Sequence, residues 1–262
     1  MNITDRTSLK EIDTAYSSLE KTIKESHASF YPYFQRHGKR YKHNAQLVSR
    51  YYKKGPVLDM GCYPPHFAIL LKTLGYPVQG VDLNPDRCRH LAERFALDVI
   101  GWDIERSPLP FGNEAFEFVI FSEVFEHLHR DPLFALSEVN RIMTTGGTLL
   151  LTTPNIYAIQ RVVRFLSGKS FNDPIFEFEK LRSTGHMGHI REYAPIEIRR
   201  FLVMINFRLI KRYFRHYYFP VSIKGLCTRV LFSVLPPFFR TYQIIVAEKM
   251  GPGPGYNPLR LG

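Results

Sequence analysis

The sequence has few of the features that mark secreted, metal-finger or membrane-spanning proteins. Its three cysteines, Cys62, Cys88 and Cys227, lack the spacing of a metal site. Because three thiols cannot all pair with one another, we expect a reducing, cytoplasmic environment. The first residues are polar and charged, which argues against a secretory signal, and no apolar run reaches the ~18 residues of a membrane-spanning helix.

The chain is also poor in acidic residues relative to basic ones. Its 262 residues hold 35 Lys and Arg against 24 Asp and Glu, a formal net charge of +11. This excess favours acidic partners such as phosphorylated substrates, nucleic acid or anionic lipid, although a solvated basic surface explains it equally well. The length fits one α/β domain with insertions, and a hydrophobic content of 45% is enough for a full core.

Short apolar runs alternate with helical patterns through the middle of the chain. The expected strands are 56–60, 78–82, 97–101, 116–122, 147–152, 207–214 and 241–248. The expected helices between the first five strands are 65–74, 85–95 and 131–142. Strands that alternate with helices of about ten residues predict βαβ units and a parallel sheet.

Acidic residues follow three successive strands of this pattern. Asp59 ends the first strand, Asp82 ends the second, and Asp103 comes just after the third. In an open α/β sheet, ligands bind outside the carboxyl ends of the strands. Carboxylates there suit a ligand with an ammonium group and a ribose diol, and the alternative is that they cap helices or turns.

These motifs resemble those of the class I S-adenosylmethionine-dependent methyltransferases. The matching segments are 56–62 (first motif), 78–82 (second motif), 101–104 (adenine-side acidic motif), 116–128 (fourth strand and its turn) and 141–155 (Gly-Gly turn and fifth strand). The resemblance covers roughly residues 55–155, in the family's order. It implies a Rossmann-like fold, with a seven-stranded, mostly parallel sheet flanked by helices, and S-adenosylmethionine as the cofactor.

The resemblance also implies a set of cofactor-binding residues. Asp59 would lie near the ammonium group, Asp82 would accept hydrogen bonds from the ribose, and Asp103 would accept one from the adenine amino group. The full implied set is Asp59, Gly61, Cys62, Tyr63, Asp82, Leu83, Asp103, Ile104 and Ser122. The family pattern Asp-x-Gly-x-Gly-x-Gly is broken by Tyr63 and Pro65, so a homologue that no longer binds the cofactor is an alternative.

Glu123, Glu126 and His127 directly follow the fourth strand, with the spacing Glu-x-x-Glu-His. This spacing places two carboxylates and an imidazole on one helical turn. The motif resembles that of the ubiquinone-pathway O-methyltransferases and of the small-RNA 3′-terminal 2′-O-methyltransferases. In the second group it implies a divalent metal and a further histidine from later in the chain, for which His189 and His186 are candidates.

Three roles remain open for these residues. Mg²⁺, Mn²⁺ or Zn²⁺ on Glu123, Glu126, His127 and His189 would activate a substrate hydroxyl. Alternatively, His127 or His189 acts as a metal-free base, with Glu123 as a third catalytic candidate, or the residues are structural. Arg182 and Arg191 are candidates for holding an anionic group of the substrate.

We divide the chain into an N-terminal helical extension (1–54), a methyltransferase domain (55–250) and a flexible tail (251–262). Within the domain, 155–193 is expected to be a lid insertion after the fifth strand. The apolar, aromatic insertion 217–240 either covers the edge of the sheet or contacts a membrane surface or a lipid substrate.

The function that this pattern favours is S-adenosylmethionine-dependent O-methylation of a small hydroxylated acceptor, such as a saccharide, a phenolic compound or a lipid-linked molecule. RNA 2′-O-methylation is the second hypothesis. The positive charge and the metal-type motif favour it, but the sequence has no recognisable RNA-binding module. A non-catalytic scaffold that kept the fold is the third.

Overall fold

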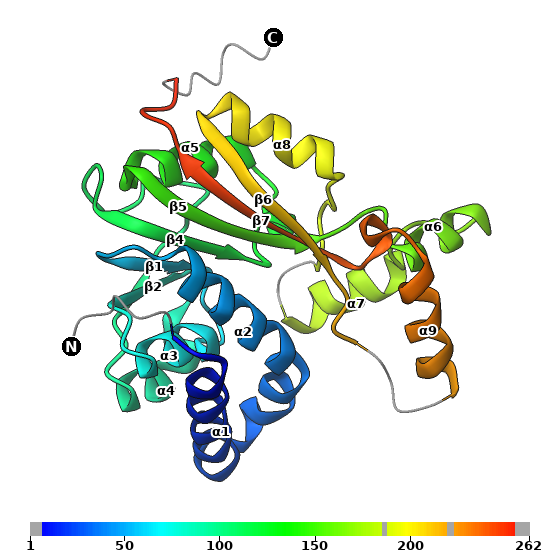
Figure 1. Ribbon diagram of the computed structural model, residues 1–262, viewed down its shortest axis with the longest axis horizontal. Coiled ribbons are helices and arrows are strands. Elements are labelled where there is room, and N and C mark those ends of the chain that lie inside the picture. Colours follow the sequence, from blue (N-terminus) through cyan, green and yellow to red (C-terminus); the bar gives the residue numbers. More distant parts are fainter. Residues whose placement is uncertain (1–6, 185–187, 219–222, 255–262) are drawn as a thin grey trace. The chain divides into compact units, whose positions relative to one another are not determined.

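The computed structural model describes residues 7–184, 188–218 and 223–254 (Figure 1). Its strands are β1 (Val57–Met60), β2 (Val78–Asp82), β3 (Val99–Gly101), β4 (Phe116–Ser122), β5 (Met143–Pro154), β6 (Phe207–Arg215) and β7 (Tyr242–Lys249). Its α-helices are α1 (Leu9–Ser26), α2 (Tyr31–Tyr51), α3 (His66–Thr73), α4 (Arg89–Arg94), α5 (Pro132–Ile142), α6 (Ile159–Leu166), α7 (Pro174–Thr184), α8 (Pro195–Met204) and α9 (Ile223–Val234). Short 3₁₀ turns are η1 (Ala28–Phe30), η2 (Pro85–Cys88), η3 (Phe125–His127) and η4 (Pro237–Phe239).

Seven strands of the described chain form one sheet, in the order β3-β2-β1-β4-β5-β7-β6. β1 pairs with β2, and β2 with β3, in parallel, whereas β6 and β7 are antiparallel. Helices connect the parallel strands, as parallel pairing requires. The predicted Rossmann-like α/β fold is therefore confirmed.

The chain divides into two compact units. The first comprises Met1–Ile120 and Arg141–Leu150, and the second comprises Phe121–Asn140 and Leu151–Gly262. Strands β4 and β5 each pass from one unit into the other. With the exception of Ser122, the predicted cofactor residues lie in the first unit, whereas the predicted glutamates and histidines lie in the second.

The parallel strands of the first unit bring the predicted carboxylates to one end of the sheet. Asp59 is opposite Gly80, and Asp82 is opposite Gly101. Every residue of β1 is buried, as expected for a central parallel strand. A Cβ on Gly80 would lie 2.7 Å from the Sγ of Cys62, so no side chain fits there without displacing that thiol.

Helices α1 and α2 make up most of the N-terminal segment. Ser8 caps α1, because its hydroxyl accepts from the Glu11 N–H and the Glu11 carboxylate accepts from the Ser8 N–H. Tyr16 of α1 stacks on Phe34 of α2 with ring centroids 4.7 Å apart. A Cβ on Gly38 would lie only 2.0 Å from the Tyr16 hydroxyl oxygen, so glycine lets the two helices approach closely.

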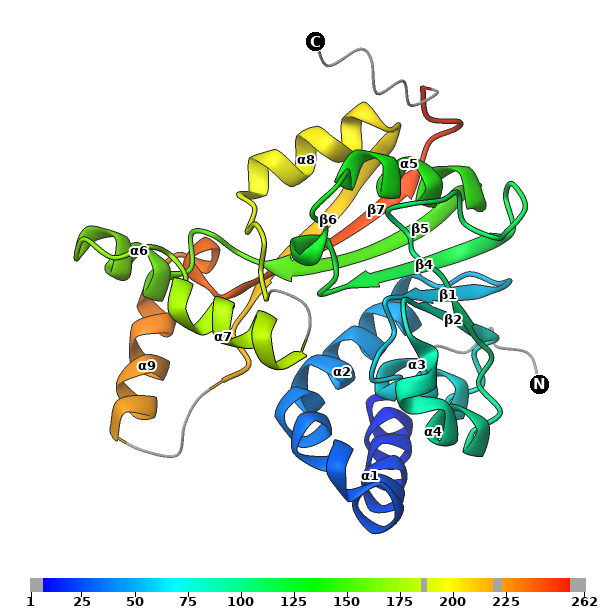
Figure 2. The same cartoon turned by 180° about the vertical axis from the view of Figure 1, so that it is seen from behind.

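The second unit is built on the antiparallel pair β6 and β7. Helix α8 precedes β6 at one end of this pair, and α6, α7 and α9 lie toward its other end (Figure 1); Figure 2 gives the same view from behind. The side chain of Asn155 donates to the backbone oxygens of Phe238 and Arg240 at 2.6 and 2.9 Å, which joins the end of β5 to η4. None of the helices in the described residues combines the length and the apolarity that crossing a bilayer demands.

The predicted flexible tail, 251–262, lies partly outside the described residues. Its first residues are bonded to the second unit, because the side chain of Asn140 donates to the oxygen of Gly251 at 3.2 Å and accepts from the N–H of Gly253 at 2.8 Å. The start of this segment is therefore anchored by hydrogen bonds.

Candidate functional site

Asp59 is a buried carboxyl at the end of β1, only 4% exposed. Burial raises its pKa to about 8, the charge of Asp82 adds to the rise, and Arg40 opposes it. A buried acid in this state is stabilised in its charged form when a ligand brings a positive group close. Asp59 therefore fits the predicted role beside the ammonium group of S-adenosylmethionine.

Asp82 organises the turn that follows β1. Its Oδ2 accepts from the Tyr63 N–H at 3.1 Å, and its Oδ1 accepts from the Asn84 N–H at 3.0 Å. Gly61 begins this turn at φ +65°, a conformation that glycine adopts without strain. Each carboxylate oxygen has a further lone pair, which leaves acceptor capacity for a ribose diol.

Leu83 and Asp103 fit an adenosine ligand to different degrees. Leu83 is 72% exposed directly beside Asp82, and an exposed large apolar side chain at a strand end suits the face of a base. Asp103 accepts from the Glu105 N–H at 3.0 Å and pairs with Arg106 Nε at 3.0 Å. It thus caps its own turn, and the half-buried Ile104 lies within that turn.

Tyr63 replaces a glycine of the family's pattern. Its backbone N–H donates to Asp82 in the turn, and its ring contacts the N-terminal helical extension. The ring meets Phe30 edge-on at 6.3 Å between centroids. The Arg87 guanidinium lies 3.7 Å from the centre of the Tyr63 ring, a cation–π contact. The buried Cys62 beside it packs against Gly80.

Ser122 and Glu123 meet at Thr152 in the second unit. The Ser122 and Thr152 hydroxyl oxygens are 2.8 Å apart, and the Thr152 hydroxyl donates to Glu123 Oε1 at 2.8 Å. Glu123 has φ +58°, which is uncommon for a residue other than glycine, and it precedes η3. The expectation that both glutamates share one helical turn was wrong, because the chain bends sharply at Glu123.

Glu126 is the fully buried member of the Glu-x-x-Glu-His motif. Its Oε2 accepts from the Thr153 hydroxyl at 2.9 Å. Its backbone oxygen accepts from the N–H groups of Ile190 and Arg191 at 2.9 and 3.2 Å. These bonds hold the segment that carries His189 against η3.

His127 and His189 are each fixed through Nδ1. His127 Nδ1 lies 2.5 Å from the backbone oxygen of Gly188, and His189 Nδ1 lies 2.8 Å from Glu192 Oε1. Because a carbonyl and a carboxylate only accept, both Nδ1 atoms must carry the hydrogen. In the neutral rings the lone pair is therefore on Nε2.

Glu192 accepts the hydrogen bond that fixes the His189 ring. It is buried and forms an ion pair with Arg161 of α6. Burial alone would raise its pKa, but the hydrogen bond from His189 and the charge of Arg161 lower it below the usual value. Glu192 is therefore ionised at neutral pH and orients the His189 ring.

Glu126, His127 and His189 form a group with the composition of a metal site. Each offers a ligand atom, and these atoms all lie within 4.8 Å of one another. Glu123, the fourth predicted ligand, is outside this group. His186, the competing histidine, lies outside the described residues.

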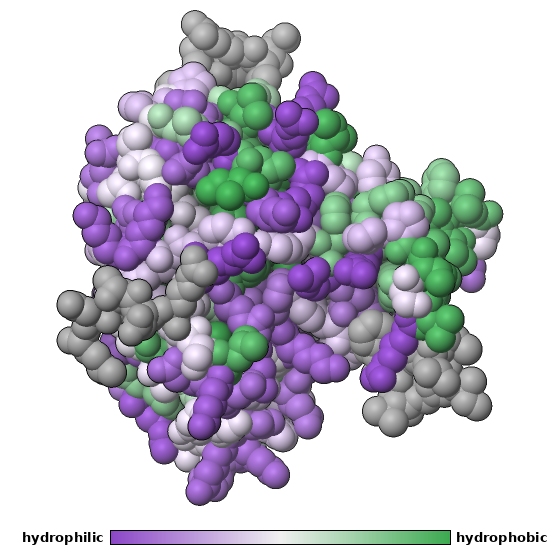
Figure 3. All heavy atoms as spheres, in the orientation of Figure 1, coloured by the Kyte–Doolittle hydropathy of each residue, from purple (hydrophilic) through white to green (hydrophobic). Residues whose placement is uncertain are grey.

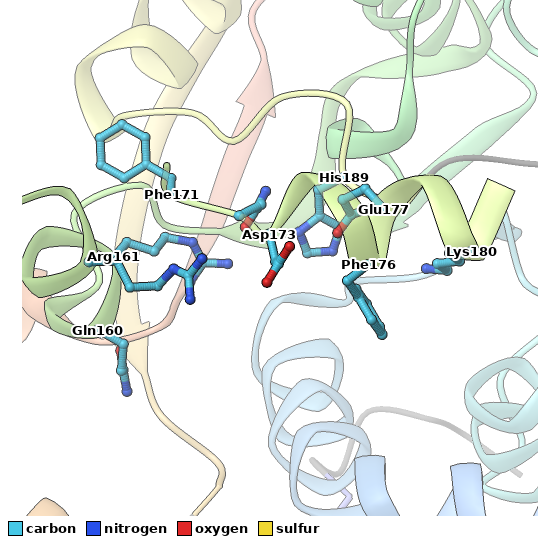
Figure 4. Close-up of a pocket in the computed structure, with 10 residues that line it drawn as sticks. Gln160, Arg161, Phe171, Asp173, Phe176, Glu177, Lys180 and His189 are labelled. Atoms are coloured by element: carbon cyan, nitrogen blue, oxygen red, sulfur yellow. The ribbon is translucent and has the colours of Figure 1, made fainter. Parts of the chain in front are cut away.

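A pocket of about 360 Å³ opens beside His189 (Figure 4). It lies within the second unit and is bounded by α6, α7 and the segment between them. Its lining residues are Gln160, Arg161, Arg164, Phe171, Asn172, Asp173, Phe176, Glu177, Lys180 and His189. Sequence reasoning missed it and favoured Arg182 and Arg191 instead. Arg191 pairs with Glu197 at 2.7 Å.

Known proteins share this sequence pattern and fold. The model of a methyltransferase-domain family matches residues 34–212. An uncharacterized methyltransferase of Mycobacterium tuberculosis is 34% identical over 100 residues, which cover 37% of this chain and 49% of that protein. A Mycolicibacterium smegmatis protein named for S-adenosylmethionine-dependent methyl transfer is 30% identical over 100 residues, 38% of each chain. The chain thus matches less than half the length of these curated relatives.

The fold has solved counterparts. The crystal structure of an S-adenosylmethionine-dependent methyltransferase from Archaeoglobus fulgidus superposes with a TM-score of 0.58 at 19% identity, covering 83% of this chain and 99% of that one. One from Methanosarcina mazei gives 0.56 at 17% identity, covering 78% and 97%. These likenesses concern the fold. Because the family model spans more than half of the sequence, the chain belongs to the methyltransferase-domain family, which confirms the predicted S-adenosylmethionine-dependent class.

Proposed function

We propose that this protein transfers a methyl group from S-adenosylmethionine to a hydroxyl oxygen of a small acceptor, and that His127 and His189 activate that hydroxyl. The observation that carries the proposal is the group of Glu126, His127 and His189, whose ligand atoms lie within 4.8 Å of one another while each imidazole is oriented through Nδ1. A histidine positioned in this way is a good general base near neutral pH.

The proposed step is an in-line displacement. The bound cofactor supplies a methyl carbon attached to a sulfonium, which is an easily broken bond. His127 Nε2 would take the proton of the acceptor hydroxyl while the hydroxyl oxygen forms a bond to that carbon, and the electron pair of the broken carbon–sulfur bond would stay on sulfur. A carboxyl oxygen of Glu126 lies within 4.8 Å of a ring nitrogen of His127, so a Glu126 carboxylate would stabilise the imidazolium that forms.

A divalent metal fits the same residues. Two imidazoles and one carboxylate form a mixed nitrogen and oxygen donor set, which suits Mn²⁺ or Zn²⁺ better than Mg²⁺, because Mg²⁺ prefers oxygen alone. Metal-bound histidines usually donate their other N–H to a carboxylate or a backbone carbonyl, as His189 and His127 do here. Such an ion would lower the pKa of a hydroxyl that binds to it.

The pocket beside His189 supports a compact polar acceptor. Phe171 and Phe176 supply aromatic rings to the lining, which also contains the cationic Arg164 and Lys180 and the acidic Asp173 and Glu177. Aromatic faces with a few polar groups suit a saccharide or a phenolic ring. A ribose 2′-hydroxyl of RNA offers the same reacting group, so RNA is the second candidate acceptor.

The test has two stages. Calorimetric titration with S-adenosylmethionine should give saturable binding, and the absence of heat at millimolar ligand would favour a non-catalytic scaffold. Incubation with isotopically labelled S-adenosylmethionine and pools of saccharides, phenolics, lipids or RNA should then add one methyl mass to a component of a small-molecule pool. Labelling of RNA alone, weakening steeply with salt, would replace the small acceptor by RNA.

A further inference from the structure

In helix α6 both charged residues, Arg161 and Arg164, are partly buried, whereas the apolar Val163, Phe165 and Leu166 are exposed. Arg161 points into the second unit, where it pairs with the buried Glu192. Val163 and Leu166 on the same helix are 57% and 77% exposed. A water-facing helix of a globular protein normally shows the opposite pattern. The ion pair with Glu192 fixes this orientation, so the outward apolar side is built into the site.

Helix α9 and η4 extend this exposed apolar surface. The bond from Asn155 to Phe238 holds η4 close to the start of α6. Figure 3 shows the hydrophobic atoms gathered where α6 and α9 lie. The residues of this surface, called here the α6–α9 patch, are Val163, Phe165, Leu166, Val230, Leu231, Val234 and Phe238, each between 41% and 77% exposed. Apolar clusters of this kind mark interaction sites.

The segments that supply the α6–α9 patch carry charged side chains of one sign. No Asp or Glu occurs between Glu138 and Asp173, the stretch that supplies α6. None occurs between Glu197 and Glu248, a stretch of 50 residues that supplies α9 and η4 and holds nine Lys and Arg. Exposed Lys169 and Arg229 lie in these stretches. The segments that form this apolar surface therefore add basic side chains to it and no acidic ones.

We infer that the α6–α9 patch docks on an anionic lipid bilayer and lies in its headgroup region. Apolar side chains flanked by Lys and Arg are the combination that binds such interfaces, through apolar burial and attraction to acidic headgroups. A second copy of the chain would bring the same positive charge to the contact. Nucleic acid would leave Val and Leu without partners, because bases stack on aromatic rings.

Docking here would place the enzyme where a lipid-borne acceptor is found. Helix α6 supplies both the patch, through Val163 and Leu166, and the pocket, through Gln160 and Arg164. An acceptor anchored in the bilayer would reach the pocket along a single helix. This consequence rests on the proposed function, whereas membrane binding itself can be measured without any turnover.

Sedimentation of the full chain with vesicles tests the inference. Vesicles of phosphatidylcholine mixed with phosphatidylglycerol should bind the protein, and vesicles of phosphatidylcholine alone should bind it at least tenfold more weakly. Leu166→Ser should weaken binding about tenfold, because one buried leucine is lost. Lys169→Glu should have a similar effect and reduce the salt dependence. Val203→Ser on α8, 64% exposed but outside the patch, and Lys21→Glu on α1 are the matched controls.

Three results would overturn the inference. In the first, the wild-type protein stays in the supernatant when vesicles that contain phosphatidylglycerol are sedimented. In the second, Leu166→Ser binds these vesicles as strongly as Val203→Ser does. In the third, gel filtration shows that the wild-type protein is a dimer and that Leu166→Ser is a monomer, which would mean that a second copy of the chain covers the patch. Because all substituted side chains are exposed, each variant should keep the melting temperature of the wild type, and a thermal melt checks that it folds.

Discussion

In the first unit, burial favours the uncharged forms of two titratable groups, whereas in the second unit a buried acid is kept ionised. Burial lowers the pKa of His66 to about 3 and raises that of Asp59 to about 8. In contrast, His189 and Arg161 hold the pKa of buried Glu192 below its usual value. These three buried groups thus meet the cost of burying charge in different ways.

The two buried acids, Asp59 and Glu192, differ in whether the protein itself supplies a charge that keeps them ionised. Asp59 would gain its partner from a bound ligand, and His66 is a packing residue that stays neutral among the rings of Phe34 and Tyr41. Glu192 and Arg161 form a permanent pair that orients His189. Substitutions in the first unit should therefore affect stability or cofactor binding, and substitutions in the second unit should affect turnover or metal binding.

Loss of the His127 imidazole should have the largest effect. His127→Ala should lower turnover by about 10²–10⁴-fold, because it removes the proposed base, while S-adenosylmethionine affinity measured by calorimetry stays the same. His66→Phe, which replaces a fully buried histidine outside the candidate site, serves as the control and should retain turnover. Wild-type turnover in His127→Ala would exclude both a base and a metal-ligand role for this residue.

Glu192→Gln probes the orientation of His189. The variant keeps the shape of the side chain but removes the charge that holds Nδ1–H, so Zn²⁺ or Mn²⁺ affinity should fall by about 10–100-fold in a calorimetric titration. Glu248→Gln, which weakens another ion pair of the same unit with Arg208, should leave metal affinity unchanged. Equal affinities in the two variants would mean that Glu192 serves only to bind Arg161.

The sequence predicted the sheet well because its strands are buried and bounded by turns. The expected strands 78–82 and 116–122 coincide with β2 and β4. The segment 155–193 resisted prediction for a physical reason. The N-cap residue of α6, Ala158, provides no capping side chain. Three of the apolar residues of α6, Val163, Phe165 and Leu166, are exposed, so its periodicity does not mark a core face.

The sequence named candidate members of the site but not their connections. The strand ends and the resemblance to the methyltransferases predicted roles for Asp59, Asp82 and His189, and these roles stay predictions. It could not pair Arg161 with Glu192, because these residues are 31 positions apart and belong to a segment without a readable pattern. The exclusion of Glu123 from the ligand group follows from a positive φ, which no residue preference would have indicated.

His66→Phe should stabilise the fold. Among the described residues both ring nitrogens of His66 are buried without a hydrogen-bond partner, which costs about 1–3 kcal/mol that a phenyl ring avoids. Because the pKa of His66 falls to about 3 in the folded protein, the unfolded chain binds the extra proton between about pH 6.5 and 3, and stability declines as pH falls through that window.

The variant should therefore lose less stability between pH 7 and 4 than the wild type in urea titrations. His37 has a pKa lowered to about 3 as well, so part of the decline should remain in the variant. Identical pH profiles for the two proteins would show that His66 is able to take up its proton within the fold.

The smallest effect should be a proton released from Asp59 when the cofactor binds. With a pKa of about 8, Asp59 keeps its proton at pH 7 in the free protein, and an ammonium group beside it would displace that proton. The binding heat measured at pH 7 in different buffers should then change in proportion to the ionisation heat of the buffer, with a slope that corresponds to the release of about one proton. Affinity should rise as the pH increases toward 8, because the ionised form then needs no proton to be removed. Asp59→Asn should abolish both dependences, and a wild-type heat that is equal in all buffers would place the ammonium group away from Asp59.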